Sequence, residues 1–230
     1  PPAVRHGHES LGPLRGAVLG GIIGLGFTLS EDIAYIVQGG NAAGGAGVVG
    51  MFFLRTVMLG LGHATYTAMT GLGFGLFATM RSSWRWAMPL AGLAMGMLLH
   101  FGRNLFGSYL VMEGLGVLLI VLLNAVVVLA LFGLLLWLGW RDRQRIIEGL
   151  QGVSGVLITQ AEYAAVTSGW MLLPGWNLFN LIGLPGGFRA ARRKQVHLFQ
   201  LAFHRQRARH ASPTNPALPP TLDSEQDLLI

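Results

Sequence analysis

The amino-acid sequence predicts an all-α polytopic membrane protein with about four transmembrane helices and one re-entrant or interfacial half-helix. Only 11% of the 230 residues are charged and 52% are hydrophobic, whereas soluble domains carry about 25% charged residues. The apolar residues are concentrated in long runs, and the run Leu115–Trp140 contains no charged residue. Because about 20 apolar residues suffice for a helix to cross a bilayer, these runs predict membrane spans.

Four apolar segments are predicted to cross the membrane after a polar flank, residues 1–15. A turn or loop rich in glycine and alanine, Gly39–Gly47, separates the first two segments. The four are Gly16–Gln38, a segment that ends at Met80, Trp86–Leu105 and Leu115–Trp140. Residues 16–140 therefore form the predicted transmembrane domain.

Basic residues predict the orientation, because short cytoplasmic loops are enriched in Lys and Arg. They lie in the N-terminal flank, in the turn Arg81–Arg85 and directly after Trp140. All three regions are cytoplasmic only if the chain crosses four times. The stretch Val48–Gly62 must then be an interfacial or re-entrant half-helix, which we favour, or a kinked extension of the second segment.

Residues 141–210 are predicted to form a cytoplasmic amphipathic and basic tail, followed by a Pro-rich disordered C-terminus at 211–230. Seven Lys and Arg residues lie between Arg189 and Arg209. Beside membrane spans, anionic lipid headgroups are the nearer partner for such a segment. We therefore expect the tail to meet the lipid bilayer and predict no nucleic-acid partner.

Small residues recur at a spacing of four within the predicted spans. Gly16, Gly20 and Gly24 share one helix face, and the pairs Gly71/Gly75 and Gly92/Gly96 repeat the pattern. Such spacing lets helix backbones approach closely in lipid. These glycines predict helix packing rather than cofactor binding.

Ionisable residues inside a span are costly, and each is a functional candidate. They are Glu31, Asp32, Arg55, His63, His100 and Arg103. With a helical rise of about 1.5 Å per residue, Glu31, His63 and His100 reach a similar depth near the outer face, and Glu31 lies about 10 Å from its predicted helix end. These three residues form the predicted catalytic site.

Each candidate also has a structural alternative. Glu31 could be only the partner of Arg55 or Arg103, and His63 could cap a helix or lie at the interface. His100 and Asn104, one turn apart on one face, could form an interhelical hydrogen-bond pair. Asp32, Arg55 and Asn104 are accordingly predicted as supporting residues.

A carboxylate and two imidazoles can activate a water and stabilise an oxyanion. The same three side chains, Glu31, His63 and His100, are also the candidate ligands for a divalent metal, since His and Glu both suit zinc. The sequence contains no H-E-x-x-H motif, so acid–base chemistry is favoured over metal chemistry. No other cofactor is predicted.

Three short motifs carry a resemblance to a known family. Phe27 and Glu31 form an F-x-x-x-E pattern, with Asp32 where an Asn is common, followed by Tyr35. The stretch from Arg55 to Gly75 contains an arginine, a histidine and a glycine-rich helix, and His100 and Asn104 form H-x-x-x-N. In this order the motifs resemble the PrsW family of glutamic-type intramembrane proteases, related to CAAX-processing enzymes and to a subunit of γ-secretase.

The resemblance implies a multi-pass plasma-membrane peptidase that cleaves membrane-anchored proteins near the extracytoplasmic face. It implies that Glu31 shares in activating water while His63 and His100 stabilise the oxyanion or bind a metal. The family's upstream Glu-Glu motif does not occur here, and the only lysine is Lys194. Because the chain begins with Pro1, we expect further sequence before it, and this fragment to be inactive. The alternatives are a non-catalytic membrane scaffold and an ion or proton transporter.

Overall fold

The structure, a computed structural model, describes residues 12–110, 116–152, 158–167, 197–202 and 205. The secondary-structure elements in this part of the chain are all helices, which confirms the all-α prediction. The chain divides into two compact units, Pro1–Leu135 and Leu136–Ile230. Each unit is described by itself below.

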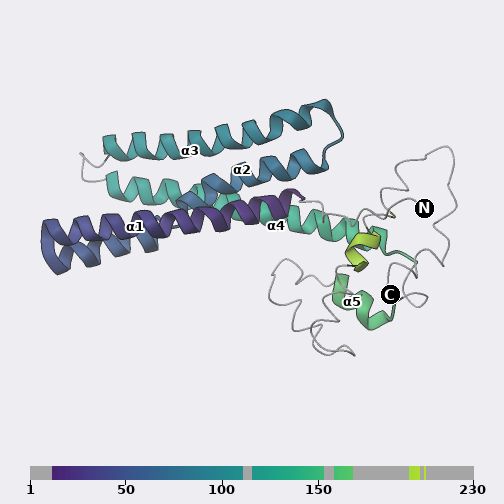
Figure 1. Ribbon diagram of the computed structural model, residues 1–230. Helices are drawn as coiled ribbons and strands as arrows, with labels where there is room; N and C mark the ends of the chain where they lie inside the picture. Colours follow the sequence, from purple (N-terminus) through teal and green to yellow (C-terminus); the bar gives the residue numbers. More distant parts are fainter. Residues whose placement is uncertain (1–11, 111–115, 153–157, 168–196, 203–204, 206–230) are drawn as a thin grey trace. The chain divides into compact units, whose positions relative to one another are not determined.

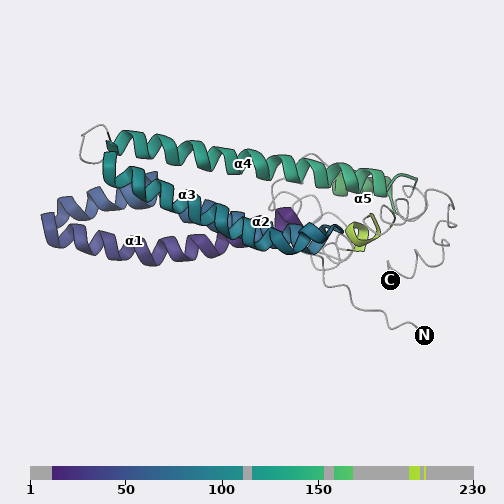
Figure 2. The same ribbon diagram turned by 90° about the horizontal axis from the view of Figure 1, so that it is seen from above.

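The first helix, α1 (Pro13–Met51), is longer than predicted and bends back on itself. Pro13 lies in its first turn, where the missing N–H costs no hydrogen bond. The predicted loop Gly39–Gly47 is helical, except that Ala43 and Gly44 leave helical geometry. Gly44 has φ 58°, a left-handed conformation that glycine adopts without strain. The chain thus turns where a turn or loop was predicted, but a two-residue kink within helix makes the turn instead of a loop (Figures 1 and 2).

After the kink, the chain returns antiparallel to the first arm of α1. The return arm comprises the end of α1, the π-helix η1 (Phe52–Met58) and α2 (Gly62–Thr79). Close approaches mark the register of this hairpin: Gly39 to Gly47, Thr28 to Gly60, Gly24 to His63, Gly20 to Thr67 and Gly16 to Gly71. The stretch Val48–Gly62 thus continues into α2, which favours the kinked extension over a separate half-helix.

The packing predicted from glycine spacing is present on both faces of α2, which lies between α1 and α3 (Figure 1). A short 3-10 helix, η2 (Ser83–Ala87), links α2 to α3 (Met88–Leu110). A Cβ atom added to Gly92 would lie 2.4 Å from the Met69 carbonyl oxygen, and one added to Gly96 would lie 2.4 Å from that of Tyr66. Glycine is therefore required where these helices meet.

The fourth long helix, α4 (Gly116–Gly149), extends nine residues beyond the predicted end at Trp140. Within the first unit, Asn124 of α4 donates from Nδ2 to the Met58 carbonyl oxygen at 3.2 Å. This bond gives a partner to a carbonyl at the end of η1, where the helix is interrupted before α2 begins. The polar residue in the otherwise apolar run therefore connects α4 to the hairpin.

The described residues have the surface of a membrane protein. Two stretches, Pro13–Thr79 taken together and Gly116–Gly149, are long and apolar enough to cross a membrane. Large apolar side chains point outward, including Ile23, which is 70% exposed, and Val126, which is 62% exposed. A bilayer would cover such side chains, whereas water would not. The prediction of an all-α membrane protein is confirmed, while the count of four crossings stays a prediction.

The second unit has a small core of its own. It contains the end of α4, α5 (Gln160–Thr167) and a helical turn at 197–202. The core consists of Ile146, Leu150, Ile158, Leu198, Leu201 and Ala202. Part of the predicted tail is thus packed against the end of α4. The predictions for residues 168–196 and 211–230, and for most of the N-terminal flank, lie outside the described residues.

Candidate active site

A partly buried ion-pair network joins the first arm of α1 to η1. Arg55 donates from Nη2 to Glu31 Oε2 at 2.6 Å, and its Nε lies 3.4 Å from Asp32 Oδ1. Thr56 donates to Asp32 Oδ2 at 2.9 Å. The guanidinium carbon of Arg55 also lies 3.8 Å from the centre of the Tyr35 ring. One arginine therefore forms ion pairs with both carboxylates, as expected where charges must be paired within a membrane.

His63, at the start of α2, is the buried centre of the cluster. Its Nε2 lies 3.4 Å from Glu31 Oε2, and its Nδ1 lies 3.4 Å from Thr28 Oγ1. The Phe27 ring packs edge-on against the imidazole, with centroids 4.9 Å apart. The close contact of Gly24 with the His63 backbone places the imidazole directly beside the first arm of α1.

The third helix contributes His100 to the same cluster. The rings of His63 and His100 lie 5.0 Å apart in an edge-to-face arrangement. His100 stacks on Tyr66 of α2 at 5.2 Å, with an angle of 17° between the planes. Three helical segments thus bring together a carboxylate, two imidazoles and a phenol.

The structure brings together the three residues predicted from depth alone, Glu31, His63 and His100. The estimate of where Glu31 lies needs correction: the helix continues to the kink at Ala43, about 18 Å further on. Of the structural alternatives, the pairing of Glu31 with Arg55 is present. Asn104 lies one turn after His100 on α3 and is exposed, and its supporting role stays a prediction.

Exposure distinguishes the two adjacent carboxylates. The Glu31 side chain is 27% exposed, whereas that of Asp32 is 6% exposed. Asp32 is closed in by Arg55 and Thr56. The Glu31 side chain remains partly accessible.

Two members of the cluster were missed at the level of sequence, Thr28 and Tyr66. Thr28 donates to the Gly60 carbonyl oxygen at 3.1 Å, beside its contact with His63. Both residues lie three positions from a predicted site residue, Glu31 and His63 respectively. Residues three apart are neighbours on a helix face, so this spacing was the signal that could have identified them.

A helical membrane protein with a carboxylate and imidazoles between its helices contains the types of side chain that an intramembrane hydrolase uses. A family model, that of the PrsW family intramembrane metalloproteases, matches residues 2–138. This match covers more than half of the chain, and the chain belongs to that family. It is therefore a membrane peptidase by family. Comparisons with characterised proteins and with solved structures found no match.

The family's description implies a metal, and the described residues do not by themselves fit one. Among them, no group of three or more His, Cys, Asp and Glu side chains is arranged to hold a metal ion. Glu31, His63 and His100, the predicted candidate ligands, fail in part because Glu31 Oε2 is bonded to the Arg55 guanidinium. Catalytic zinc sites use three protein ligands, and a cation beside the guanidinium would be repelled.

Proposed function

We propose that this chain forms part of the active site of an intramembrane peptidase, with Glu31, His63 and His100 as its catalytic residues. The observation that supports this most is the burial of the His63 Nε2 atom without a hydrogen-bond partner. Its Nε2 is buried, has no hydrogen-bond partner among the described residues, and lies 3.4 Å from Glu31 Oε2. Buried polar atoms without partners are rare in folded proteins and mark strained or catalytic positions.

The proposed reaction is hydrolysis of a peptide bond. A carboxylate has about four lone-pair sites, so the contacts of Glu31 Oε2 leave Oε1 able to accept a proton from water. The water oxygen then bonds to the scissile carbonyl carbon. Ring N–H groups of His63 and His100 donate hydrogen bonds to the resulting oxyanion. The proton passes to the leaving nitrogen, and the C–N bond breaks to give a carboxylic acid and an amine.

The proposed substrates are membrane-anchored proteins cleaved near the extracytoplasmic face of the plasma membrane. The long hairpin supports four crossings, because η1 continues into α2 and needs no separate passage. The kink at Ala43–Gly44 then lies on the outer side, and the basic turn at Arg81 lies in the cytoplasm. The tail after Trp140 would also be cytoplasmic, facing anionic headgroups.

The catalytic assignment is tested in the protein expressed from its own gene in its host. New N-termini of membrane proteins are quantified by mass spectrometry for the wild type and for Glu31→Gln, His63→Ala and His100→Ala. Loss of an acid–base group costs about 100-fold or more in rate. Each variant should therefore reduce the wild-type-dependent termini by at least about 100-fold, at unchanged amounts in the membrane.

Two matched controls come from outside the family match, Glu148→Gln and His197→Ala, and both should retain wild-type cleavage. Retained cleavage in all three site variants would rule out the assigned site. If the wild type generates no new termini, a non-catalytic scaffold is favoured. If Glu31→Gln instead abolishes ion flux in proteoliposomes, without proteolysis in the wild type, the protein is a transporter.

The topology has an independent test, because the chain contains no cysteine. Single substitutions Ala42→Cys, Ser82→Cys and Gln144→Cys provide one thiol at the hairpin kink, one in the basic turn and one after the fourth span. A membrane-impermeant maleimide applied to intact cells should label only Ala42→Cys. Labelling of Ser82→Cys from outside would contradict four crossings.

A further inference from the structure

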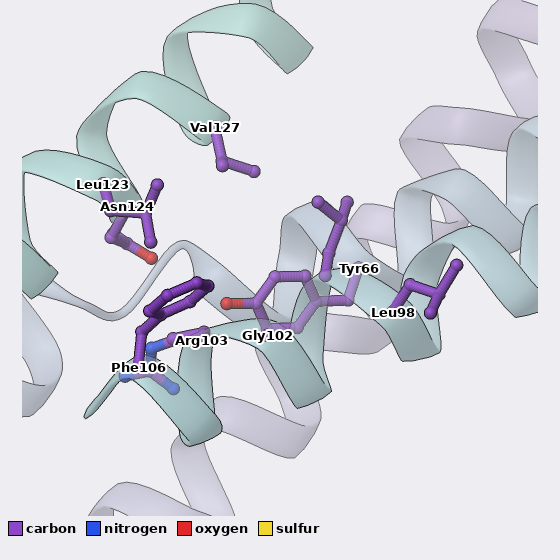
Figure 3. Close-up of a pocket in the computed structure, with 9 residues that line it drawn as sticks. Tyr66, Leu98, Gly102, Arg103, Phe106, Leu123, Asn124 and Val127 are labelled. Atoms are coloured by element: carbon purple, nitrogen blue, oxygen red, sulfur yellow. The ribbon is translucent and has the colours of Figure 1, made fainter. Parts of the chain in front are cut away.

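A cavity that is partly open to the surface adjoins the candidate active site between α2, α3 and α4. Its volume is about 190 Å³, and its lining comes from Tyr66, Leu98, Leu99, Gly102, Arg103, Phe106, Leu123, Asn124 and Val127. All these residues belong to the first unit. Figure 3 shows apolar side chains of α3 and α4, such as Leu98 and Val127, on opposite sides of the space.

The cavity has a polar end. In Figure 3 the Tyr66 hydroxyl, the Arg103 guanidinium and the Asn124 amide lie on the side where Phe106 is found. The Nε of Arg103 is buried and has no hydrogen-bond partner among the described residues. A buried donor without a partner costs free energy, and an acceptor on a bound molecule would satisfy this one.

Tyr66 connects the cavity to the proposed catalytic residues. One side of its ring stacks on His100, and the ring also lies 5.8 Å from that of His63. The same tyrosine lines the cavity. A group seated in the cavity is therefore separated from the imidazoles by the thickness of a single aromatic ring.

The size of the cavity restricts its occupant. Drug-sized ligands need about 300–1,000 Å³, whereas an apolar cavity of about 150 Å³ holds a benzene ring. The space therefore suits one large apolar side chain. A peptide also brings carbonyl oxygens next to each side chain, which supply the acceptor that Arg103 lacks.

We propose that this cavity is a specificity subsite that binds one large apolar side chain of the substrate, beside the scissile bond, with Arg103 donating to a neighbouring substrate carbonyl. This inference rests on the proposed peptidase function and extends it to a residue preference. The substrate segment would reach the cavity from the lipid between α3 and α4, because α4 makes few close contacts with the other described helices.

The subsite is tested by filling it. Val127→Phe places a bulky ring in the cavity, whereas Val126→Phe adds the same atoms one residue earlier, at a position 62% exposed on the outer face of α4. In the full-length protein, Val127→Phe should reduce cleavage at sites with a large apolar residue about 10-fold or more. Cleavage at sites with Gly or Ala at that position should be retained. The Val126→Phe variant should cleave both kinds of site as the wild type does.

Both variants are first checked for equal amounts in the membrane and equal resistance to SDS unfolding. If Val127→Phe does not unfold more readily yet leaves the residue preference unchanged, the subsite is refuted. If Val127→Phe is unstable, two milder variants replace it. Val127→Leu reduces the space and Leu99→Ala enlarges it, so the two should shift the residue preference in opposite directions.

A second measurement does not depend on cleavage. The photoreactive residue p-benzoylphenylalanine is placed at Leu99, a partly buried lining residue, or, as the control, at the exposed Val126, in the Glu31→Gln background. Position 99 should crosslink to a second polypeptide and position 126 to lipid. Absence of any crosslink to a second polypeptide at position 99 would overturn the subsite, even if Glu31→Gln abolishes cleavage. Retained cleavage in Glu31→Gln would instead overturn the catalytic assignment and leave the crosslinking result to decide on the subsite.

Discussion

The contact between the first arm of α1 and α2 depends on glycine, and Gly20 is the position at which to test this. A Cβ atom at Gly20 would lie 2.3 Å from the Thr67 carbonyl oxygen and 3.1 Å from the Ala68 Cα atom. Both neighbours are backbone atoms that cannot rotate away. Gly20→Ala must therefore push the two helices apart.

The size of the effect follows from these distances. Restoring an ordinary contact of at least 3.4 Å requires about 1 Å of extra separation, and a gap of that size forfeits about a quarter to a half of the dispersion attraction between facing atoms. Overpacking of this kind typically costs about 1–3 kcal/mol. We expect Gly20→Ala to lower the free energy of unfolding by that amount.

Gly26→Ala is the matched control on the same helix. A Cβ atom at Gly26 meets nothing within 4 Å, so the substitution adds only the better helix propensity of alanine, worth about 0.5–1 kcal/mol. Unfolding in SDS is followed by the fluorescence of the six tryptophans. Gly26→Ala should equal or exceed the wild type in stability. Equal stability of the Gly20 and Gly26 variants would refute the close backbone packing.

Three further predictions concern the ion pair, the stacked histidine and the second unit. Arg55→Met leaves two carboxylates without their cation and should lower the free energy of unfolding in SDS by about 3 kcal/mol, whereas Arg81→Met, in an exposed turn, should change it by less than about 0.5 kcal/mol. His100→Phe keeps a ring for the stack on Tyr66 but loses both ring nitrogens. Cleavage should fall about 100-fold while stability changes by less than about 1.5 kcal/mol, and an equal loss of stability and activity would point to a packing role. Leu150→Ala removes a fully buried side chain and should destabilise the second unit by about 2–5 kcal/mol, seen as faster limited proteolysis after Trp140 with unchanged cleavage of membrane substrates.

The cluster could be predicted from sequence because ionisable side chains within a membrane span are costly unless they are paired inside the protein. Glu31, His63 and His100 stand out in runs that are otherwise apolar, and burial in a bilayer favours pairing. The glycine spacing added the information that these helices approach closely. Together these two patterns anticipated which residues meet, without showing which atoms face each other.

Composition predicted where the chain turns between the first two segments, but not that the turn is almost entirely helical. A stretch of Gly and Ala reads as a loop in water, where glycine weakens helices. Within or near a bilayer, each backbone N–H and C=O must find a partner inside the protein, which favours continued helix. The chain therefore leaves helical geometry only at Ala43 and Gly44, and the cost of the turn is confined to two residues.

The cavity could not be predicted from sequence, for a different reason. Its walls come from three helices, so its existence depends on the distance between α3 and α4 rather than on any local pattern. The sequence analysis selected ionisable side chains within the spans. Tyr66 was therefore indistinguishable from a packing residue, and the uncharged Asn124 was not selected. Their convergence with Arg103 requires the three-dimensional arrangement.

The π-helix η1 is a segment of the hairpin that could accommodate a change in chain length. Its wider turns hold more residues than the α-helical turns of α1 that precede it. A one-residue deletion between Phe52 and Met58 could be absorbed by tightening to α-helix, leaving the glycine contacts of α2 in place but rotating Arg55 around the helix axis. The same deletion within α2 would rotate every later residue by about 100°. Homologous chains could therefore gain or lose the clamp on Glu31 by changing length here, without rebuilding the rest of the bundle.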